Sequence, residues 1–132
     1  MNKGQELEGF SRAVTRDRIA AYADASGDHN PLHLDDVYAK STQFGGVIAH
    51  GMLSMAFVCE LMAVNFPATW HAGGKMKLRF KAPVLPGETV RVTGQVQDIK
   101  DSQDGALALC SISCIKPDGV EALSGTFTVP LP

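Results

Sequence analysis

The sequence predicts an α+β domain in which an antiparallel sheet wraps around one long buried helix. Residues 51–65 are apolar at almost every position, and nearly everything after Trp70 shows the alternation and turn signals of β-strands. The length of 132 residues fits one domain, and no linker, repeat or low-complexity tract divides the chain. We therefore expect a single domain over residues 1–132.

The N-terminal part is predicted to hold one strand and one capped helix. Residues 5–14 alternate weakly and are interpreted as a first strand. Thr15 can cap a helix over residues 16–26, and Asp17 lies in its first turn, where a negative charge is favourable. Gly27 is suited to end this helix in the left-handed conformation.

The segment from Asp28 to His33 is predicted to be a structured loop rather than a helix. Pro31 forces the residue before it out of the helical conformation. A short helix over residues 37–41 should follow, with Asp35 or Asp36 as its cap.

The helix predicted over residues 51–65 is apolar on nearly all sides, so we expect it to be buried on most of its circumference. Four antiparallel strands should follow it, joined by turns that contain Pro-Gly, Asp-Gly and Pro-Asp-Gly. Their predicted ranges are residues 75–81, 88–99, 104–115 and 120–129. A long sheet wrapped around one buried helix satisfies this order, and this α+β arrangement is the hot-dog fold.

Charge and hydropathy exclude several classes of function. The net charge of −2 lacks the clustered basic excess of a nucleic-acid surface, so we expect no nucleic-acid partner. The longest apolar stretch, residues 52–64, is interrupted by Ser54 and Glu60 and is shorter than the roughly 18 residues of a membrane span. The first ten residues lack the apolar region of a signal peptide, and we expect a cytoplasmic location.

The three cysteines are predicted to be reduced thiols rather than a disulfide framework. Cys110 and Cys114 lie four residues apart in one predicted strand. This spacing separates their Cα atoms by roughly 13 Å. A disulfide cannot span that distance, and buried reduced thiols are the simpler interpretation.

The run Ser-Gly-Asp-His-Asn-Pro-Leu-His at residues 26–33 places a carboxylate, Asp28, and an imidazole, His33, five residues apart. Such a pair can hold one water, take a proton from it and deliver a proton to carbon, as hydration of a conjugated double bond requires. Turn chemistry explains each residue singly as well. Asp28 can form an Asx-turn, Asn30-Pro31 is a common turn, and His33 can be a satisfied core histidine.

A second candidate element is Ile-Ala-His-Gly-Met at residues 48–52, where Gly51 begins the predicted central helix. The first amides of a helix have no internal partner and carry the positive end of its dipole. A glycine lets a substrate oxygen approach the backbone closely, as a thioester carbonyl needs when it gains negative charge. Gly51 can also be an ordinary helix start without a ligand.

Taken together, residues 26–35, Ser-Gly-Asp-His-Asn-Pro-Leu-His-Leu-Asp, and residues 44–52, Phe-Gly-Gly-Val-Ile-Ala-His-Gly-Met, form a long and specific motif. This motif resembles that of the MaoC-like dehydratases, specifically the (R)-specific enoyl-CoA hydratases. The resemblance covers nearly the whole chain, including residues 77–84 and the Pro-Gly turn at residues 86–87.

The resemblance implies that Asp28 and His33 are the catalytic acid–base pair. It implies that Asn30 orients the loop and the water, and that the Gly51 backbone amide contributes to an oxyanion hole. Ser26 matches the motif and supports the turn. How the two proton transfers divide between the pair stays open, because coupled groups titrate as a unit.

The same resemblance implies reversible hydration of a trans-2-enoyl thioester to an (R)-3-hydroxyacyl thioester. No dissociable cofactor is expected beyond the coenzyme A or phosphopantetheine that belongs to the substrate. It also implies a homodimer, or a dimer of such dimers, with each active site at the subunit boundary. Some relatives carry a serine where this chain has Cys59, so Cys59 is left out of the predicted site.

No metal site is expected. His29 and His33 lie four residues apart, but Pro31 between them prevents a helical pair of ligands. His50 and His71 lack partners at ligand spacing.

Four cations fall on one face of the strand predicted over residues 75–81, and apolar residues fall on the other. The cations are Lys75, Lys77, Arg79 and Lys81, and the apolar residues are Met76, Leu78 and Phe80. A solvated face over a core face explains the pattern. The basic face is also a candidate site for the phosphates of coenzyme A or of a phosphopantetheine carrier.

Two other functions fit a hot-dog domain. A thioesterase would activate water against the carbonyl carbon and needs no Asp/His pair at this spacing. A non-catalytic acyl-thioester-binding subunit needs no acid–base pair either, and the presence of both Asp28 and His33 argues against it. Loss of enoyl absorbance would mark hydration, whereas release of free thiol would mark hydrolysis.

Overall fold

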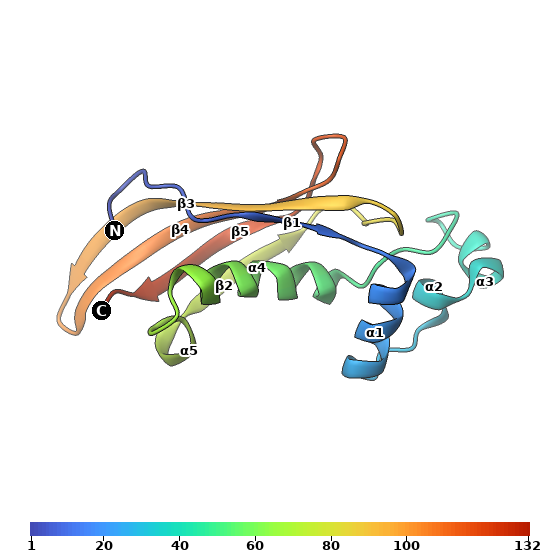
Figure 1. Ribbon diagram of the computed structural model, residues 1–132, viewed down its shortest axis with the longest axis horizontal. Coiled ribbons are helices and arrows are strands. Elements are labelled where there is room, and N and C mark those ends of the chain that lie inside the picture. The colour runs from blue at the N-terminus through green and yellow to red at the C-terminus, as the bar shows by residue number, and fades with distance from the viewer.

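Five antiparallel strands form one curved sheet in the computed structural model, which describes residues 1–132, and helix α4 (Gly51–Asn65) lies along its concave side (Figure 1). The strands are β1 (Phe10–Ala13), β2 (Lys75–Phe80), β3 (Thr89–Ser102), β4 (Gly105–Ile115) and β5 (Glu121–Pro130). Their order in the sheet is β1-β3-β4-β5-β2. The predicted α+β arrangement of one sheet around one central helix is confirmed.

The other helices gather at the two ends of the sheet. Helix α1 (Arg16–Ser26), α2 (Pro31–Leu34) and α3 (Asp36–Lys40) lie at one end, and α5 (Trp70–Gly73) lies toward the other, with both termini (Figure 1). The predicted bounds of α1 and α4 are confirmed, because their end signals are local.

Helix α1 has the end signals that the sequence predicts. The Thr15 side chain accepts a hydrogen bond from the Arg18 amide at 3.1 Å. Gly27 ends the helix with a φ of 79°, a conformation that favours glycine. The chain therefore leaves α1 at a fixed angle and enters the segment that contains Asp28.

Three predictions about local structure are wrong in part. The segment from Asp28 to His33 is not all loop, because Pro31 begins the short helix α2, and a proline is favourable at the first position of a helix. Residues 70–73 form α5 rather than a strand. The first strand is confined to Phe10–Ala13, and of the residues before it only Glu6 forms an isolated bridge, to Gln95.

The core lies between the concave face of the sheet and α4. Gly94 of β3 and Gly125 of β5 both pair with Ile112 of β4, so they lie in one row across the sheet. A Cβ atom at Gly94 would lie 2.9 Å from the Leu7 side chain and 3.1 Å from Leu61 of α4, and one at Gly125 would overlap the Lys77 carbonyl oxygen. Close packing of β5 on β2 therefore requires glycine at position 125, whereas a larger residue at position 94 would displace the leucine side chains that pack there.

One side of α4 is uncovered, contrary to the prediction that most of its circumference is buried. Met52 and Val64 are 49% and 51% exposed. Met76 and Phe80 of β2, predicted to face the core, are 41% and 53% exposed. The physical reason is that β2 is an edge strand, so its alternation does not correspond to one covered face and one solvated face.

All three cysteines are free thiols, as predicted. Burial raises the pKa of Cys110 and of Cys114 to about 11, and it also raises the pKa of the half-buried Cys59. None of them is therefore a ready thiolate nucleophile at neutral pH. No helix of the structure has the length and hydropathy needed to cross a membrane.

Candidate active site

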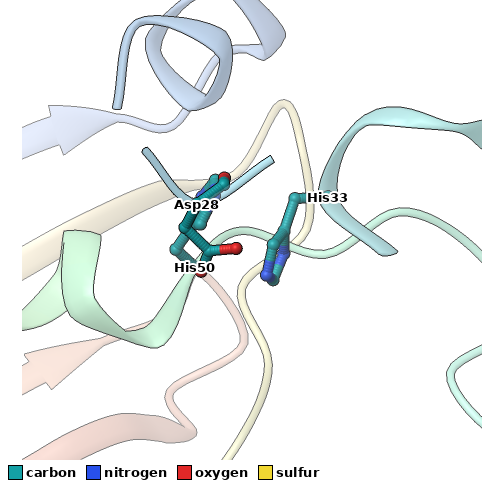
Figure 2. A group of neighbouring side chains, drawn as sticks. All are labelled: Asp28, His33 and His50. Atoms are coloured by element: carbon teal, nitrogen blue, oxygen red, sulfur yellow. The ribbon is translucent and has the colours of Figure 1, made fainter. Parts of the chain in front are cut away.

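The segment between α1 and α2 presents the Asp28 carboxylate toward the ring of His33 (Figure 2). The Ser26 hydroxyl accepts a hydrogen bond from the Asp28 amide at 3.2 Å, and Asp28 Oδ1 accepts one from the Asn30 amide at 3.2 Å. Asn30 Oδ1 then accepts from the Leu32 amide at 3.0 Å and caps α2. The Asx-turn at Asp28 therefore forms, and it holds the carboxylate beside His33 rather than replacing that contact.

His33 is held by one ring nitrogen and leaves the other free. Its Nδ1 lies 2.7 Å from the carbonyl oxygen of Ile48. Because a carbonyl only accepts, Nδ1 carries the proton, and Nε2 of the neutral ring carries the lone pair. This nitrogen can accept a proton from a water molecule, as the predicted role of His33 requires.

His50 completes the cluster and was not among the site residues predicted from the sequence. One ligand-type atom from each of Asp28, His33 and His50 lies within 4.8 Å of the others (Figure 2). The His50 ring stacks on the His33 ring with centroids 3.9 Å apart, and its other side meets Tyr22 at 4.9 Å. His50 Nε2 lies 2.9 Å from the Asp28 carbonyl oxygen.

The three side chains are types that bind metal ions, but their geometry does not favour one. Imidazole ligands direct an in-plane lone pair at the metal. The rings of His33 and His50 are stacked with an interplanar angle of 28°, so their in-plane lone pairs do not converge on one point. In addition, His33 Nδ1 and His50 Nε2 are engaged by backbone carbonyls. The cluster suits proton transfer better than metal binding.

Helix α4 begins directly after His50, with Gly51 as its first residue. No side chain caps this end, and the amides of Gly51 and Met52 have no acceptor within the chain. These free amides, at the positive end of the helix dipole, can bind an oxygen that gains negative charge. A free amide at Gly51 is what the predicted oxyanion role requires, and that role stays a prediction.

A largely apolar hollow of about 310 Å³ opens beside this helix start. Its lining includes Phe44, Ile48, His50, Gly51, Phe80 and Val84. A Cβ atom at Gly51 would lie 3.1 Å from the Phe80 ring, so a larger residue there would crowd this wall of the hollow. His50 belongs both to this lining and to the cluster with Asp28 and His33, and it connects the two parts of the site.

The four predicted cations, three on β2 and Lys81 directly after it, line two separate hollows. Lys77, Arg79 and Lys81 line one shallow hollow over β2 and β5, whereas Lys75 lines another with Asp104. Lys81 also lines the hollow beside Gly51. A phosphate-bearing carrier could therefore contact three of the four predicted cations from one position.

Lys81 is partly engaged by Glu121, at 3.2 Å between Nζ and Oε1. The Ser113 hydroxyl donates to the other oxygen of Glu121 at 2.6 Å. The hydrogen bond from Ser113 and the contact with Lys81 together lower the pKa of Glu121, so this carboxylate is charged at neutral pH. Lys77 and Arg79 form no ion pair within the chain and are the freer cations.

Comparisons with known proteins place the chain in a family. The MaoC-like domain matches residues 2–109. An (R)-specific enoyl-CoA hydratase of Aeromonas caviae is 33% identical over 114 residues, which cover 86% of this chain and 84% of that protein. A mitochondrial 3-hydroxyacyl-[acyl-carrier-protein] dehydratase of Solanum lycopersicum, FERN, is 30% identical over 122 residues, which cover 92% of this chain and 73% of that protein.

Solved structures agree with the sequence comparisons. The (R)-hydratase from A. caviae involved in PHA biosynthesis superposes with a TM-score of 0.85 at 30% identity, covering 100% of this chain and 98% of that one. R-hydratase PhaJ1 from Pseudomonas aeruginosa also gives a TM-score of 0.85, at 29% identity, covering 100% of this chain and 83% of that one. The fold is thus that of the hot-dog hydratases, as predicted. The chain belongs to the MaoC-like dehydratase family.

Proposed function

We propose that this protein catalyses reversible hydration of trans-2-enoyl thioesters to (R)-3-hydroxyacyl thioesters. The observation that carries the proposal is that Asp28 and His33 lie in one cluster with His50. His50 directly precedes α4, whose first amides are free. An acid–base pair and an oxyanion site are the two components that this reaction needs. The (R)-specific name of relatives at 33% and 36% identity supports the stereochemistry.

In the hydration direction, one water lies between Asp28 and His33. Its oxygen forms a bond to C3 of the enoyl group while the pair takes one proton from it, and the C2–C3 double bond becomes a single bond. The pair returns a proton to C2, so it ends with the protons it began with. The lone pair on His33 Nε2 is an acceptor for the water proton, and its orientation is fixed by the Ile48 carbonyl.

Negative charge develops on the thioester carbonyl as water adds at C3. The free amides at the start of α4 are the donors proposed to stabilise this charge. Glycine at position 51 leaves the approach beside the Phe80 ring open. The apolar hollow there would receive the part of the substrate that adjoins the carbonyl.

The substrate would carry its own cofactor portion, coenzyme A or phosphopantetheine, and no separate cofactor is proposed. Lys77 and Arg79, with Lys81 as the link to the hollow beside Gly51, are proposed to attract the phosphates of that carrier. Lys75 lies in a separate hollow and is not part of this proposal.

We further propose that the functional unit is a homodimer or a dimer of such dimers. The uncovered side of α4, with Met52 and Val64, and the edge strand β2, with Met76 and Phe80, expose apolar surface that a second copy would cover. Light scattering at low micromolar concentration tests this, and a fully active, monodisperse species near 14.1 kDa would contradict it.

The proposed reaction is tested with crotonyl-CoA and a series of longer trans-2-enoyl-CoA substrates. Hydration should remove the enoyl absorbance without releasing free thiol, and chiral analysis should find the (R)-3-hydroxyacyl product. Thiol release would indicate a thioesterase instead. Tight binding of acyl-CoA without any turnover would indicate a non-catalytic binding subunit.

A further inference from the structure

We propose that His50 is a positioning residue that fixes the Asp28 backbone and the His33 ring in place relative to the start of α4. This inference rests on the proposed hydration, because it assigns a role within that site. The family resemblance implies a role for Gly51 and none for its neighbour His50. The structure shows that His50 contacts both members of the acid–base pair from outside the segment that carries them.

The first contact is a hydrogen bond to the segment that carries Asp28. His50 Nε2 lies 2.9 Å from the Asp28 carbonyl oxygen, and because that oxygen only accepts, Nε2 carries the proton. Asp28 itself is exposed and belongs to a segment without regular structure. The bond therefore ties an exposed loop to a side chain that is only 2% exposed, 22 positions later in the sequence.

The second contact is the ring stack. His50 lies between Tyr22 of α1 and His33 of α2, with centroid distances of 4.9 and 3.9 Å. His33 is thus fixed on one face by His50 and at Nδ1 by the Ile48 carbonyl. These two constraints define the direction of its free Nε2, which is the atom that must meet the water.

A third observation separates positioning from simple packing. Nδ1 of His50 is buried and has no hydrogen-bond partner. An unpaired buried acceptor is destabilising, so a side chain selected for stability alone would be apolar here. Nor does His50 serve as a helix cap, although it occupies the N-cap position of α4. Its polar contribution is directed to Asp28.

Three variants separate the hydrogen bond from the ring. His50→Phe keeps an aromatic ring between Tyr22 and His33 but removes the donor to Asp28. His50→Gln can place an amide N–H near the position of Nε2, whereas in His50→Asn the shorter side chain places it near Nδ1. The Gln and Asn variants are matched in chemistry and differ in reach.

With a saturating enoyl-CoA substrate, His50→Phe and His50→Asn should lower kcat by about 10- to 100-fold, because a misplaced catalytic group costs on this order. KM should change by less than about twofold, since positioning acts on the reacting groups rather than on carrier binding. His50→Gln should be several times more active than both. The melting temperature of His50→Phe should equal or exceed that of the parent, because the unpaired nitrogen is gone.

Either of two kinetic results would overturn the inference: a His50→Phe variant with unchanged kcat, or a Gln variant no more active than the Asn variant. Loss of activity that only follows loss of folded protein would also overturn it, in favour of a structural role. Imidazole ¹⁵N NMR tests the contacts independently of activity. It should find the proton of His50 on Nε2 and that of His33 on Nδ1, and the opposite His50 tautomer would refute the bond to Asp28 even if hydration is confirmed.

Discussion

The two ends of α4 are built in opposite ways. At the C-terminal end, Asn65 accepts a hydrogen bond from the Glu8 amide at 2.8 Å and donates to the carbonyls of Glu8 at 3.1 Å and Leu61 at 2.8 Å. Beyond it, the Trp70 and Phe127 rings pack with centroids 5.0 Å apart. At the N-terminal end no side chain caps the helix, and its first amides are free. We call this N-terminal end the open end of α4 and the C-terminal end its closed end.

This difference indicates which end serves the fold and which serves the chemistry. Polar groups at a helix end are normally satisfied by caps or by neighbouring chain. At the C-terminal end the Phe66 amide caps the Met62 carbonyl, and the Asn65 side chain anchors α4 to the N-terminal segment. The N-terminal end departs from that rule at Gly51 and also leaves His50 Nδ1 unpaired. Departures from local rules that gather in one place are characteristic of functional sites.

The largest expected effect is at the acid–base pair beside the open end. Asp28→Asn and His33→Ala should each lower kcat by about 100-fold or more, because each removes a group that transfers protons. The double variant should lose less than the product of the two losses, since the groups act as a unit. Both single variants should fold like the parent, because neither residue belongs to the buried core.

Steady-state hydration of crotonyl-CoA, with circular dichroism as the folding control, measures these losses. Full activity of both single variants would show that the site assignment is wrong. The free amides at the N-terminal end of α4 would then no longer indicate a catalytic site.

The next largest effect concerns the free amide at position 51. Gly51 is the first residue of α4, where proline is tolerated, and His50 has φ −61° and ψ 133°, which suits a residue before proline. Gly51→Pro therefore removes the amide without breaking the helix. Any Cβ atom at position 51 would crowd the Phe80 ring. The variants Gly51→Pro and Gly51→Ala are therefore compared in a Phe80→Leu background, which relieves that crowding.

In that background, Gly51→Pro should have a kcat about 100-fold below that of Gly51→Ala, the magnitude typical of one oxyanion-hole donor. The two variants share the added Cβ atom and differ in the amide. Equal kcat values in the two variants would exclude an oxyanion role for the Gly51 amide, whatever the effect of crowding.

At the closed end, a substitution should change stability and leave catalysis alone. Asn65→Ala removes three side-chain hydrogen bonds and leaves the Glu8 amide and carbonyl without their partner. We expect a loss of about 1–3 kcal/mol in the free energy of unfolding, measured by urea titration. The kcat of the folded protein should be unchanged.

Thr69→Ala is the matched control for this end. Thr69 precedes α5 at the same end of the molecule, but its side chain makes no capping hydrogen bond. Its replacement should change stability by less than about 0.5 kcal/mol. If Asn65→Ala instead lowered kcat with stability unchanged, the assignment of the C-terminal end to stability and of the N-terminal end to catalysis would be wrong.

The sequence predicted the bounds of both long helices because their signals are local: Thr15 and Gly27 for α1, and the apolar run for α4. A long motif singled out Asp28 and His33, which the structure brings together with His50, but the helix that begins at Pro31 was not predicted. Exposure of Met76 was missed, since an edge strand is recognised only once the strand order is known.

His50 was missed for a related reason. Its partners lie 17 and 22 positions earlier, and no spacing rule links a histidine before one helix to a loop after another. A signal was present, because His50 is the polar residue that follows the apolar run Val47-Ile48-Ala49. A histidine predicted to be buried needs a partner, and the adjacent motif offered two.

The smallest expected effect compares cations of β2 that line two separate hollows. Lys77→Glu and Arg79→Glu should raise KM for a coenzyme A substrate by about two- to fivefold at low salt, since an exposed charge contact contributes at most about 1 kcal/mol. Lys75→Glu makes the same charge change in the separate hollow with Asp104 and should leave KM nearly unchanged. The increases should shrink at high salt, because exposed charges are screened, and should be small for a pantetheine analogue that lacks the nucleotide phosphates.

Light scattering of each variant controls for altered assembly through the edge strand β2. An unchanged KM in all three variants at low salt would mean that these cations form an ordinary solvated face. An equal rise in all three would mean that the protein attracts the carrier by its overall charge, without a phosphate site near the open end of α4.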